Sequence, residues 1–433
     1  MRPRLRIPSP QRPTQDPEPT PAGKPERAVL VGVSQPRSSG DNNTLNELAR
    51  LLETAGGEEV GRLQVVRERP DPATFIGGGK VRMLALEVGR VEADLVVFDD
   101  ELSPAQAAKV EEATGVRVVD RSALILDIFA RRARTREART QVEMARLNYL
   151  LPRLTRRWSH LGRQIGGIGV RGEGEKQLEI DRRLLRQRIQ RLRSELHKID
   201  RARSERRKRR RRTFQVALVG YTNAGKTTLF NVLTGATGRT EDRLFVTLDP
   251  LVRPLKRSGS RRILAIDTVG FVRKLPHALV ASFRSTLREA AQADLLLHVV
   301  DPAVEGYEQQ METAHQVLAE LDLSQTPTID VFTKVDKVAE PGILERATRL
   351  YPDACLVSSF TGAGIPALVD RVVRSGTVEE SLVLAAQDGA AMARLRRETE
   401  ILETVYHGTR VEVRYRVARQ WAKRVRSVAG EGG

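Results

Sequence analysis

The sequence is short of cysteine, of aromatic residues and of long apolar runs. Only 4% of its 433 residues are Phe, Trp or Tyr, so stacking of bases on aromatic side chains is not expected to be its main way of binding nucleic acid. Its one cysteine, Cys355, cannot form an intrachain disulfide, which favours a reducing compartment. No stretch approaches the ~20 apolar residues that span a bilayer, and the arginine-containing N-terminus lacks the apolar core of a signal peptide. We therefore expect a cytoplasmic protein that is not integral to a membrane.

Positive charge is what the chain has in excess. Its 73 Lys and Arg residues against 55 Asp and Glu residues give a formal net charge of +18. Such an excess favours a polyanionic partner, either nucleic acid or an acidic membrane surface, and charge alone does not choose between the two. The length is sufficient for about two to four domains, each with its own core.

The first 120 residues divide into a tail and a small domain. Residues 1–26 are rich in Pro and charge and poor in large apolar residues, which predicts a disordered tail. Residues 27–120 predict an α/β domain with a parallel sheet, with strands at 28–33, 59–67, 94–98 and 116–119 and helices at 43–54, at 79–90 and from 103. Gly77-Gly78-Gly79-Lys80 resembles part of a phosphate-binding loop but lacks its full spacing, so we interpret it as a glycine turn before a helix.

Residues 121–212 change to long helical periodicity. Helices at about 136–151 and 177–210 flank the glycine-rich stretch 166–174, which predicts two antiparallel helices joined by a flexible tip. Because glycine weakens packing and extends reach, we interpret the tip as a probe for a partner. The second helix ends in a basic run that is either a solvated linker or a contact for phosphates. The candidate RNA-binding residues are Arg163, Arg171, Arg206, Arg207, Lys208, Arg209 and Arg210.

A phosphate-binding loop is predicted where the next domain, residues 213–375, begins. Gly220-Tyr221-Thr222-Asn223-Ala224-Gly225-Lys226-Thr227 has the spacing G-x-x-x-x-G-K-[ST] and follows the apolar run 216–219. Its glycines let backbone N–H groups and a helix N-terminus point at phosphate oxygens. Lys226 would supply charge to the outer phosphates and Thr227 would bind Mg²⁺. The alternative is a simple glycine-containing turn, so the remaining motifs decide.

Further apolar strands are predicted at 263–266, 295–300, 329–332 and 356–357, and their carboxyl ends lie where α/β sheets bind ligands. Asp267 is predicted to hold Mg²⁺ through water, and the Gly270 amide is predicted to read the terminal phosphate. Thr247, in a mobile switch segment, would add a second hydroxyl to the metal. Hydrolysis would then release both segments, giving an order-to-disorder switch.

The choice of base is predicted to lie in Thr333-Lys334-Val335-Asp336. The Asp336 carboxylate can accept from the two adjacent donors on guanine, and the Lys334 stem can pack on the ring. Alone, this tetrapeptide is more often a surface turn, but its position after the other two loops favours a base site. The predicted nucleotide-binding residues are Gly220, Tyr221, Thr222, Asn223, Ala224, Gly225, Lys226, Thr227, Thr228, Phe245, Val246, Thr247, Asp267, Thr268, Val269, Gly270, Thr333, Lys334, Asp336, Ser358, Ser359 and Phe360.

These loops resemble those of the translation-factor-related GTPases, with two departures. That group usually has Asn where this chain has Thr333, and Ser-Ala where it has Ser358-Ser359. The first change is expected to weaken a contact that tethers the loop while leaving guanine specificity in place. The second changes a side chain at a point where the backbone contacts the base.

The flanking segments resemble the HflX family of ribosome-associated GTPases over about residues 28–375. The segments that carry the resemblance are Val119-Asp120-Arg121, Leu124 to Phe129, Gln141-Val142-Glu143, Leu151-Pro152-Arg153-Leu154, Gly166-Gly167-Ile168-Gly169, Gly174 to Arg183 and Asp267-Thr268-Val269-Gly270-Phe271. The resemblance implies binding to the large ribosomal subunit and its rRNA, GTP hydrolysis stimulated there, and dissociation of stalled or idle ribosomes. Some family members also use ATP, which makes ATP a second candidate nucleotide.

Two alternatives to this function stay open from the sequence. The first is a nucleotide-gated rRNA-binding or ribosome-assembly factor that does not split ribosomes. The second is a generic ATPase, which competition between guanine and adenine nucleotides would distinguish.

No residue stands out as the catalytic group. Many GTPases carry a glutamine directly after the switch glycine to orient water, and this chain has Phe271 there. The intrinsic rate is therefore expected to be low, with Asn223, Thr247 and Gly270 as candidates and a partner supplying what is missing. Asn223 resembles the loop asparagine of potassium-activated relatives, which makes K⁺ a candidate second cofactor beside Mg²⁺; the alternative is a turn-favouring residue.

Residues 376–433 predict a small C-terminal domain, with a helix at about 390–400 and a half-buried strand at 409–417 that has a cationic face. The predicted fold class is thus α/β multidomain. It comprises a small N-terminal α/β domain, a long helical hairpin, a P-loop GTPase domain with a mostly parallel sheet and a small C-terminal α+β domain. The protein is expected to be a monomer.

Overall fold

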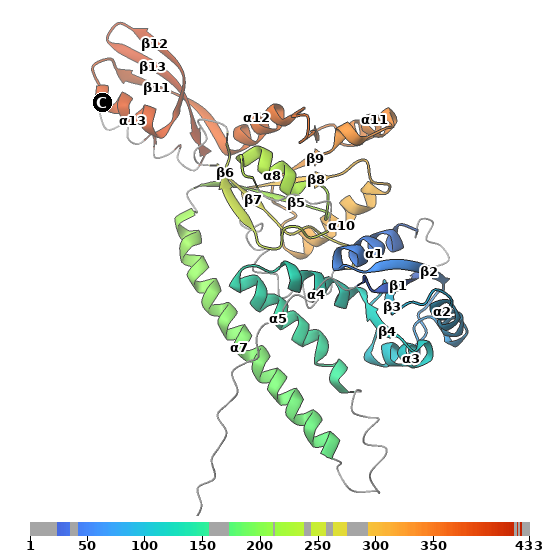
Figure 1. The fold of residues 1–433 in the computed structure, drawn as a ribbon. Coiled ribbons are helices and arrows are strands. Elements are labelled where there is room, and N and C mark those ends of the chain that lie inside the picture. Colours follow the sequence, from blue (N-terminus) through green and yellow to red (C-terminus); the bar gives the residue numbers. More distant parts are fainter. Residues whose placement is uncertain are drawn as a thin grey trace, which may run out of the picture.

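The computed structural model describes residues 24–34, 42–155, 173–210, 213–237, 244–256, 263–274, 293–419, 422, 425 and 426. Most of the expected tail, the glycine-rich tip, Arg163 and Arg171 lie outside these residues, as do the side chains of Arg206, Arg207, Lys208, Arg209 and Arg210. The described residues form four parts that follow one another along the chain (Figure 1). Within those ranges, no helix has both the length and the apolar content needed to cross a membrane.

The N-terminal part is a parallel sheet covered by helices on both faces. Its strands lie in the order β2-β1-β3-β4. Alternate residues of β1 face opposite layers, because Ala28 and Leu30 pack with α1 while Val29 and Val31 pack with α2 and α3. A sheet buried on both faces accounts for the continuous apolar strands that the sequence shows. The elements are β1 (Arg27–Ser34), α1 (Asn42–Ala55), β2 (Glu58–Val66), α2 (Gly78–Arg90), β3 (Leu95–Phe98), α3 (Pro104–Thr114) and β4 (Arg117–Asp120).

The turn at Gly77 precedes α2, as expected for a glycine turn before a helix. Gly77 has a φ of 84°, and no side chain caps the helix that follows. The contrast is α3, where Ser103 and Gln106 form a capping box. Any binding of ATP at the Gly77 turn stays a prediction.

The second part is helical and contains α4 (Arg121–Arg132), α5 (Arg136–Leu150), the short helix η1 (Arg153–Thr155) and α7 (Glu173–Arg210). Helices α5 and α7 lie side by side, and α7 extends far beyond the other layers (Figure 1). Arg136 pairs with Glu195 and Glu143 pairs with Arg188. Residue numbers rise along one helix as they fall along the other, so the two helices are antiparallel, as the sequence predicts.

The third part is a six-stranded sheet in the order β10-β9-β8-β5-β7-β6. All neighbouring strands are parallel except β6, which pairs antiparallel with β7. Helices α8 and α12 cover one face, and α10 covers the other. The elements are β5 (Phe214–Gly220), α8 (Lys226–Thr234), β6 (Leu251–Pro254), β7 (Ile263–Asp267), β8 (Leu295–Val300), α10 (Tyr307–Glu320), β9 (Thr328–Phe332), η2 (Val335–Lys337), α11 (Pro341–Leu350), β10 (Cys355–Leu356) and α12 (Ile365–Gly376).

The C-terminal part is an antiparallel sheet of β11 (Thr377–Ala385), β13 (Arg410–Ala418) and β12 (Glu400–His407), with α13 (Gly389–Glu398) on one face. The expectation of a cationic face on β13 is wrong. Arg414 pairs with Glu403, and Arg416 pairs with both Glu379 and Glu400. Glutamates on the two neighbouring strands lie opposite these arginines in the register and neutralise the face.

A buried arginine joins the N-terminal part to the third part. The Arg121 side chain is 2% exposed, and its guanidinium donates to Asp99 over 2.6 Å and to Glu47. It also donates to the backbone oxygen of Arg273 over 3.1 Å. Lys274 donates in turn to Asp99 over 2.9 Å. The segment that follows β7 is therefore held against the carboxyl ends of β3 and β4.

We predict that Arg121→Met destabilises the protein by about 3–5 kcal/mol, because it leaves buried carboxylates without their cation. Thermal unfolding of the full chain would measure the loss. Arg117→Ala is the matched control, since Arg117 and Glu26 form an ion pair whose side chains are both 59% exposed; it should cost about 0–1 kcal/mol. Equal losses in the two variants would contradict a structural role for the buried pair.

Candidate nucleotide-binding site

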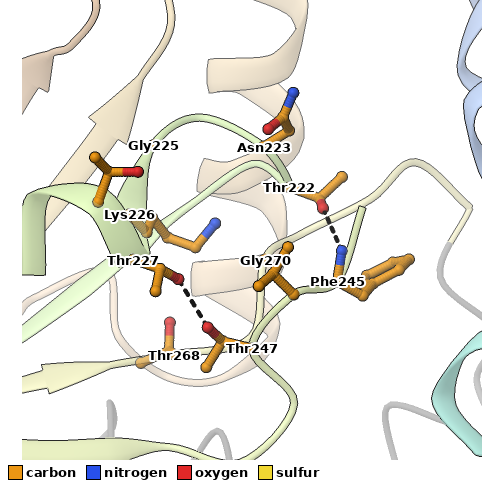
Figure 2. Close-up of a pocket in the computed structure, with 11 residues that line it drawn as sticks. Thr222, Asn223, Gly225, Lys226, Thr227, Phe245, Thr247, Thr268 and Gly270 are labelled. Carbon is orange, nitrogen blue, oxygen red and sulfur yellow. Dashed lines mark hydrogen bonds between the residues drawn. The ribbon is translucent and has the colours of Figure 1, made fainter. Parts of the chain in front are cut away.

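The phosphate loop forms where β5 ends and α8 begins. Gly220 has a φ of 137°, and a Cβ atom there would lie 2.2 Å from the backbone oxygen of Val299. No residue with a side chain fits this position, so the turn depends on glycine. Helix α8 then starts at Lys226 and directs its N-terminus into the turn (Figure 2).

The segment after β7 lies against the phosphate loop. A Cβ atom at Gly270 would come within 2.6 Å of the Thr222 Cα and 2.8 Å of the Lys226 Nζ. Phe271 donates its N–H to the Gly220 oxygen over 3.0 Å and accepts from the Thr222 N–H over 2.7 Å. The Phe271 ring is buried in the core beneath the loop. The aromatic residue at the glutamine position is thus a packing residue, directed away from the pocket.

A pocket opens between the phosphate loop, the Thr247 segment and the Gly270 segment (Figure 2). Eleven predicted nucleotide-binding residues line it, namely Thr222, Asn223, Gly225, Lys226, Thr227, Thr228, Phe245, Val246, Thr247, Thr268 and Gly270. They come from three separate stretches of the sequence, 222–228, 245–247 and 268–270, which the fold brings together at one edge of the sheet.

Three oxygen-bearing side chains meet at one end of this pocket. The Asp267 Oδ2 atom accepts from Thr227 Oγ1 over 2.8 Å and from Thr247 Oγ1 over 3.0 Å, and the two hydroxyls are 2.7 Å apart. The Asp267 Oδ1 atom is buried and has no hydrogen-bond partner among the described residues. Hydroxyl and carboxylate oxygens are ligands that Mg²⁺ prefers, so these residues fit the ion.

The charges at this end are incompletely compensated. Burial raises the pKa of Asp267, although Lys226 and the two hydroxyls act in the opposite direction. Burial also lowers the pKa of Lys226 to about 8, against the effect of Asp267. Its amine donates to the Tyr221 oxygen over 2.6 Å. A divalent cation beside Asp267 and phosphate oxygens beside Lys226 would each favour the charged form.

The predicted base loops lie at the other end of the site. The Thr333 hydroxyl donates to the Ala224 oxygen of the phosphate loop over 2.6 Å. Threonine therefore still tethers the loop, and the expected weakening relative to asparagine stays a prediction. Lys334 donates to the Asn223 oxygen over 2.9 Å and pairs with Asp301 over 2.8 Å. Asp336 lies exposed in the turn that follows.

The second base loop follows β10, the neighbour of β9. Ser358 is buried, and its hydroxyl accepts from the Thr361 N–H over 3.0 Å, so it shapes the loop. Ser359 is half-buried, and Phe360 is 91% exposed. The loop of Phe360 lies next to that of Asp336, so a purine held by Asp336 would offer the ring a flat surface to pack on.

The sequence did not indicate that residues of the N-terminal part lie beside the phosphate loop. Asn46, Glu47 and Arg50 of α1 line a cavity of about 110 Å³ beside Asn223. The Tyr221 hydroxyl donates to Glu47. Burial and then the charge of Glu47 raise the pKa of Tyr221, which keeps the hydroxyl protonated. No local motif marks these α1 residues, since their role depends on how two domains pack.

It also missed the second role of the switch segment around Thr247. Phe245 packs edge-to-face on Phe129 of α4, with ring centroids 4.7 Å apart. Two residues after Thr247, the Asp249 carboxylate accepts from the Thr135 hydroxyl and from the N–H groups of Arg134 and Thr135, the two residues just before α5. The segment thus contacts the pocket on one side and the helical part on the other.

We predict that Phe360→Ala weakens guanine-nucleotide binding by about 1–3 kcal/mol, or roughly 5- to 150-fold in Kd, because aromatic stacking on the base is lost. Titration with a fluorescent GDP analogue would measure this change. Tyr406→Ala removes another exposed aromatic side chain, from the C-terminal sheet, and should leave the Kd unchanged. An unchanged Kd in Phe360→Ala would show that the ring does not contact the base.

Comparison with known proteins gives matches over most of the chain. Three family models cover it in turn: GTP-binding GTPase N-terminal over residues 42–130, GTP-binding GTPase middle region over 132–210, and 50S ribosome-binding GTPase over 215–334. A GTP-binding protein from Sulfolobus solfataricus, solved with GDP, is 23% identical, covers 81% of this chain and 98% of that chain, and has a TM-score of 0.42.

Two curated relatives show the family. The GTPase HflX of Magnetococcus marinus is 43% identical over 88% of this chain and 89% of that relative. The GTPase HflX of Escherichia coli K12 is 44% identical over 85% of this chain and 88% of that relative. With identity of this level along nearly the whole chain, and with a phosphate loop that positions its lysine and threonine in a shared pocket, this protein is a P-loop GTPase that belongs to the HflX family.

Proposed function

We propose that this GTPase binds the large ribosomal subunit and its rRNA and dissociates stalled or idle ribosomes, with the bound nucleotide controlling binding and release. The observation that carries the proposal is the double contact of the switch segments. The same few residues face the nucleotide pocket and hold the helical part, so a change in nucleotide changes the support of the hairpin.

The first switch segment supplies one half of this coupling. Thr247 points its hydroxyl at the metal-binding end of the pocket, while Asp249 holds Thr135, the N-cap residue of α5. Phe245 and Leu248 of the same segment pack in one core with α4. Ordering of Thr247 by a metal and a terminal phosphate would therefore order the base of the hairpin as well.

The second switch segment supplies the other half. Gly270 packs against the phosphate loop, and three residues later the Arg273 N–H donates to the Tyr221 hydroxyl over 2.8 Å. The backbone oxygen of the same residue accepts from Arg121 of the N-terminal part. Loss of the terminal phosphate would loosen the Gly270 segment. Because Arg273 belongs to this segment, its hydrogen bond to Arg121 of the N-terminal domain would loosen as well.

The hairpin has the charge that contact with rRNA requires. Along the part of α7 whose side chains are described, basic residues are exposed at Arg183, Arg186, Arg191, Arg193, Lys198 and Arg201. Of the residues proposed to contact RNA, Arg163 and Arg171 precede this helix in the sequence, and Arg206 to Arg210 are its last residues. A ribosomal partner would place the protein in the cytoplasm, and we expect it to act as a monomer.

Catalysis is proposed to depend on the partner. Phe271 is in the core, and among the candidates Asn223, Thr247 and Gly270 all line the pocket. Of the three, only Asn223 carries a carboxamide like that of the missing glutamine, and it lies in the phosphate loop and not in the Gly270 segment. Docking on the large subunit would order the Thr247 and Gly270 segments and raise the rate, so equal turnover with and without large subunits would contradict this part of the proposal.

We predict that intact ribosomes incubated with the protein and a non-hydrolysable GTP analogue separate into subunits during sedimentation, whereas GDP leaves them intact. Binding of the GTP form, rather than hydrolysis, would supply the free energy for splitting. Particles that bind the protein but stay intact would favour the alternative of an rRNA-binding or assembly factor.

Asp249→Ala is the variant that tests the coupling in the same assay. It removes the carboxylate that holds the N-cap residue of α5 but no group that lines the pocket, so the preference of ribosomes for the GTP form of the protein over its GDP form should fall by about 1–2 kcal/mol, or roughly 5- to 30-fold. Asp388→Ala is the control, because Asp388 caps α13 with a 2.9 Å bond far from the switches. An unchanged preference in Asp249→Ala would contradict gating through this contact.

A monovalent cation is the proposed second cofactor. Asn223 has a φ of 63° and lies in the phosphate loop at the rim of the pocket. We predict that turnover with large subunits is several-fold faster in potassium than in sodium salts, and that Asn223→Ala abolishes the difference. Equal rates of the wild-type protein in the two salts would leave Asn223 as a residue that suits the left-handed turn.

A further inference from the structure

Two histidines and an aspartate meet between the GTPase sheet and α10, outside the nucleotide pocket. His298 lies in the middle of β8, Asp330 lies on β9 and His315 lies on α10. One potential ligand atom from each residue lies within 4.8 Å of the other two. This is the one such cluster of three His, Cys, Asp or Glu residues found among the described residues.

The fold brings these residues together through the β8-α10-β9 crossover. His298 and Asp330 are register partners on neighbouring parallel strands, and their side chains point to the same face of the sheet. Helix α10 covers that face, with Ala314 buried against it, so the next residue, His315, comes to the edge of the interface. The sequences of β8, β9 and α10 contain no motif that would predict the cluster.

The geometry is close to that of a metal site. The His298 Nδ1 and Asp330 Oδ1 atoms are 2.8 Å apart, and the two imidazole centroids are 5.1 Å apart at an angle of 51°. Ligand bonds of about 2.1 Å in a tetrahedron place ligand atoms roughly 3.4 Å from one another. Side-chain rotations that move the ligand atoms by about 1 Å would therefore bring all three ligands to one ion.

Burial is graded across the cluster. His298 is 1% exposed, Asp330 is half-buried and His315 is exposed. An ion can therefore reach the site from solvent while one ligand is held rigidly by the core. Desolvation, followed by the neighbouring His298, lowers the pKa of His315, which favours the neutral imidazole that binds metals.

We propose that His298, His315 and Asp330 form a binding site for a zinc ion. Two imidazoles and one carboxylate match the nitrogen and oxygen ligands of zinc, whereas Mg²⁺ prefers oxygen ligands alone. With three protein ligands, a fourth position stays open for water. On binding, the ion would take the place of the direct contact between His298 Nδ1 and Asp330 Oδ1.

The site connects to the nucleotide pocket through the two strands. Asp330 is three residues before Thr333, which tethers the base loop to the phosphate loop. His298 is three residues before Asp301, which pairs with Lys334 of the same base loop. A zinc ion that links β8, β9 and α10 would therefore stiffen the support of the base loop.

The competing explanation is that His298 and Asp330 are a buried polar pair that happens to lie near His315. The two explanations differ in what they require of His315, because a polar pair needs no third ligand. Since the His315 side chain is exposed, His315→Asn should fold normally and preserve the pair. An unchanged Kd for GDP would check that the variant is folded.

The test is calorimetric titration of Zn²⁺ into the full chain saturated with GDP and Mg²⁺, which keeps the nucleotide site filled. We expect one ion per chain with a Kd in the micromolar range or below, and at least about tenfold weaker binding in His315→Asn and Asp330→Asn. His407→Asn is the control, because the exposed His407 lies 4.0 Å from Glu412 without belonging to a cluster of three ligands. Its Zn²⁺ affinity should match that of the wild-type protein.

A second measurement identifies the ligands directly. Co²⁺ added to the same protein should give the intense visible absorption of a four-coordinate site, and the band should disappear in His315→Asn but persist in His407→Asn. The proposal is overturned if the wild-type protein binds no zinc below about 100 µM, or if His315→Asn binds it as tightly as the wild type.

Discussion

Two side chains that are two residues apart, Thr247 and Asp249, tie the nucleotide pocket to the helical part of the molecule. The Thr247 hydroxyl reaches Asp267 at the metal-binding end, while the Asp249 carboxylate holds Thr135, the N-cap residue of α5. A segment this short cannot satisfy one partner and move freely with respect to the other. The proposed function depends on this constraint, through which a change at the pocket would be transmitted to the hairpin.

The N-terminal part adds a second attachment that is electrostatic and buried. Arg121 binds carboxylates of its own domain and the backbone of Arg273, and Tyr221 of the phosphate loop reaches Glu47. Charges removed from water must be paired within the fold, so this interface has one favoured geometry. It holds the N-terminal domain against the segment after β7, which we propose responds to the terminal phosphate.

The C-terminal sheet and helix α7 show that the same charged residue types can produce surfaces of different net charge. On the outer face of β13, arginines and glutamates alternate across strands and neutralise one another, so this face has little net charge to attract RNA. On α7, exposed arginines outnumber the acidic residues beside them. The position of each charge relative to its neighbours, and not the total of +18, decides which surface suits an anionic partner.

The sequence by itself determined the phosphate loop, the order of helices and strands in the N-terminal domain, the antiparallel hairpin and the family. These features are local: the Gly220 to Thr227 spacing, the period of apolar residues and the helix boundaries each depend on residues close together in the chain. Only the tertiary structure decided that Thr333 reaches Ala224, that Phe271 lies in the core, that β13 is neutralised, and that Asp249, Arg121 and Glu47 join the domains. Those contacts link residues far apart in the sequence, where periodicity and spacing carry no information about which side chains meet.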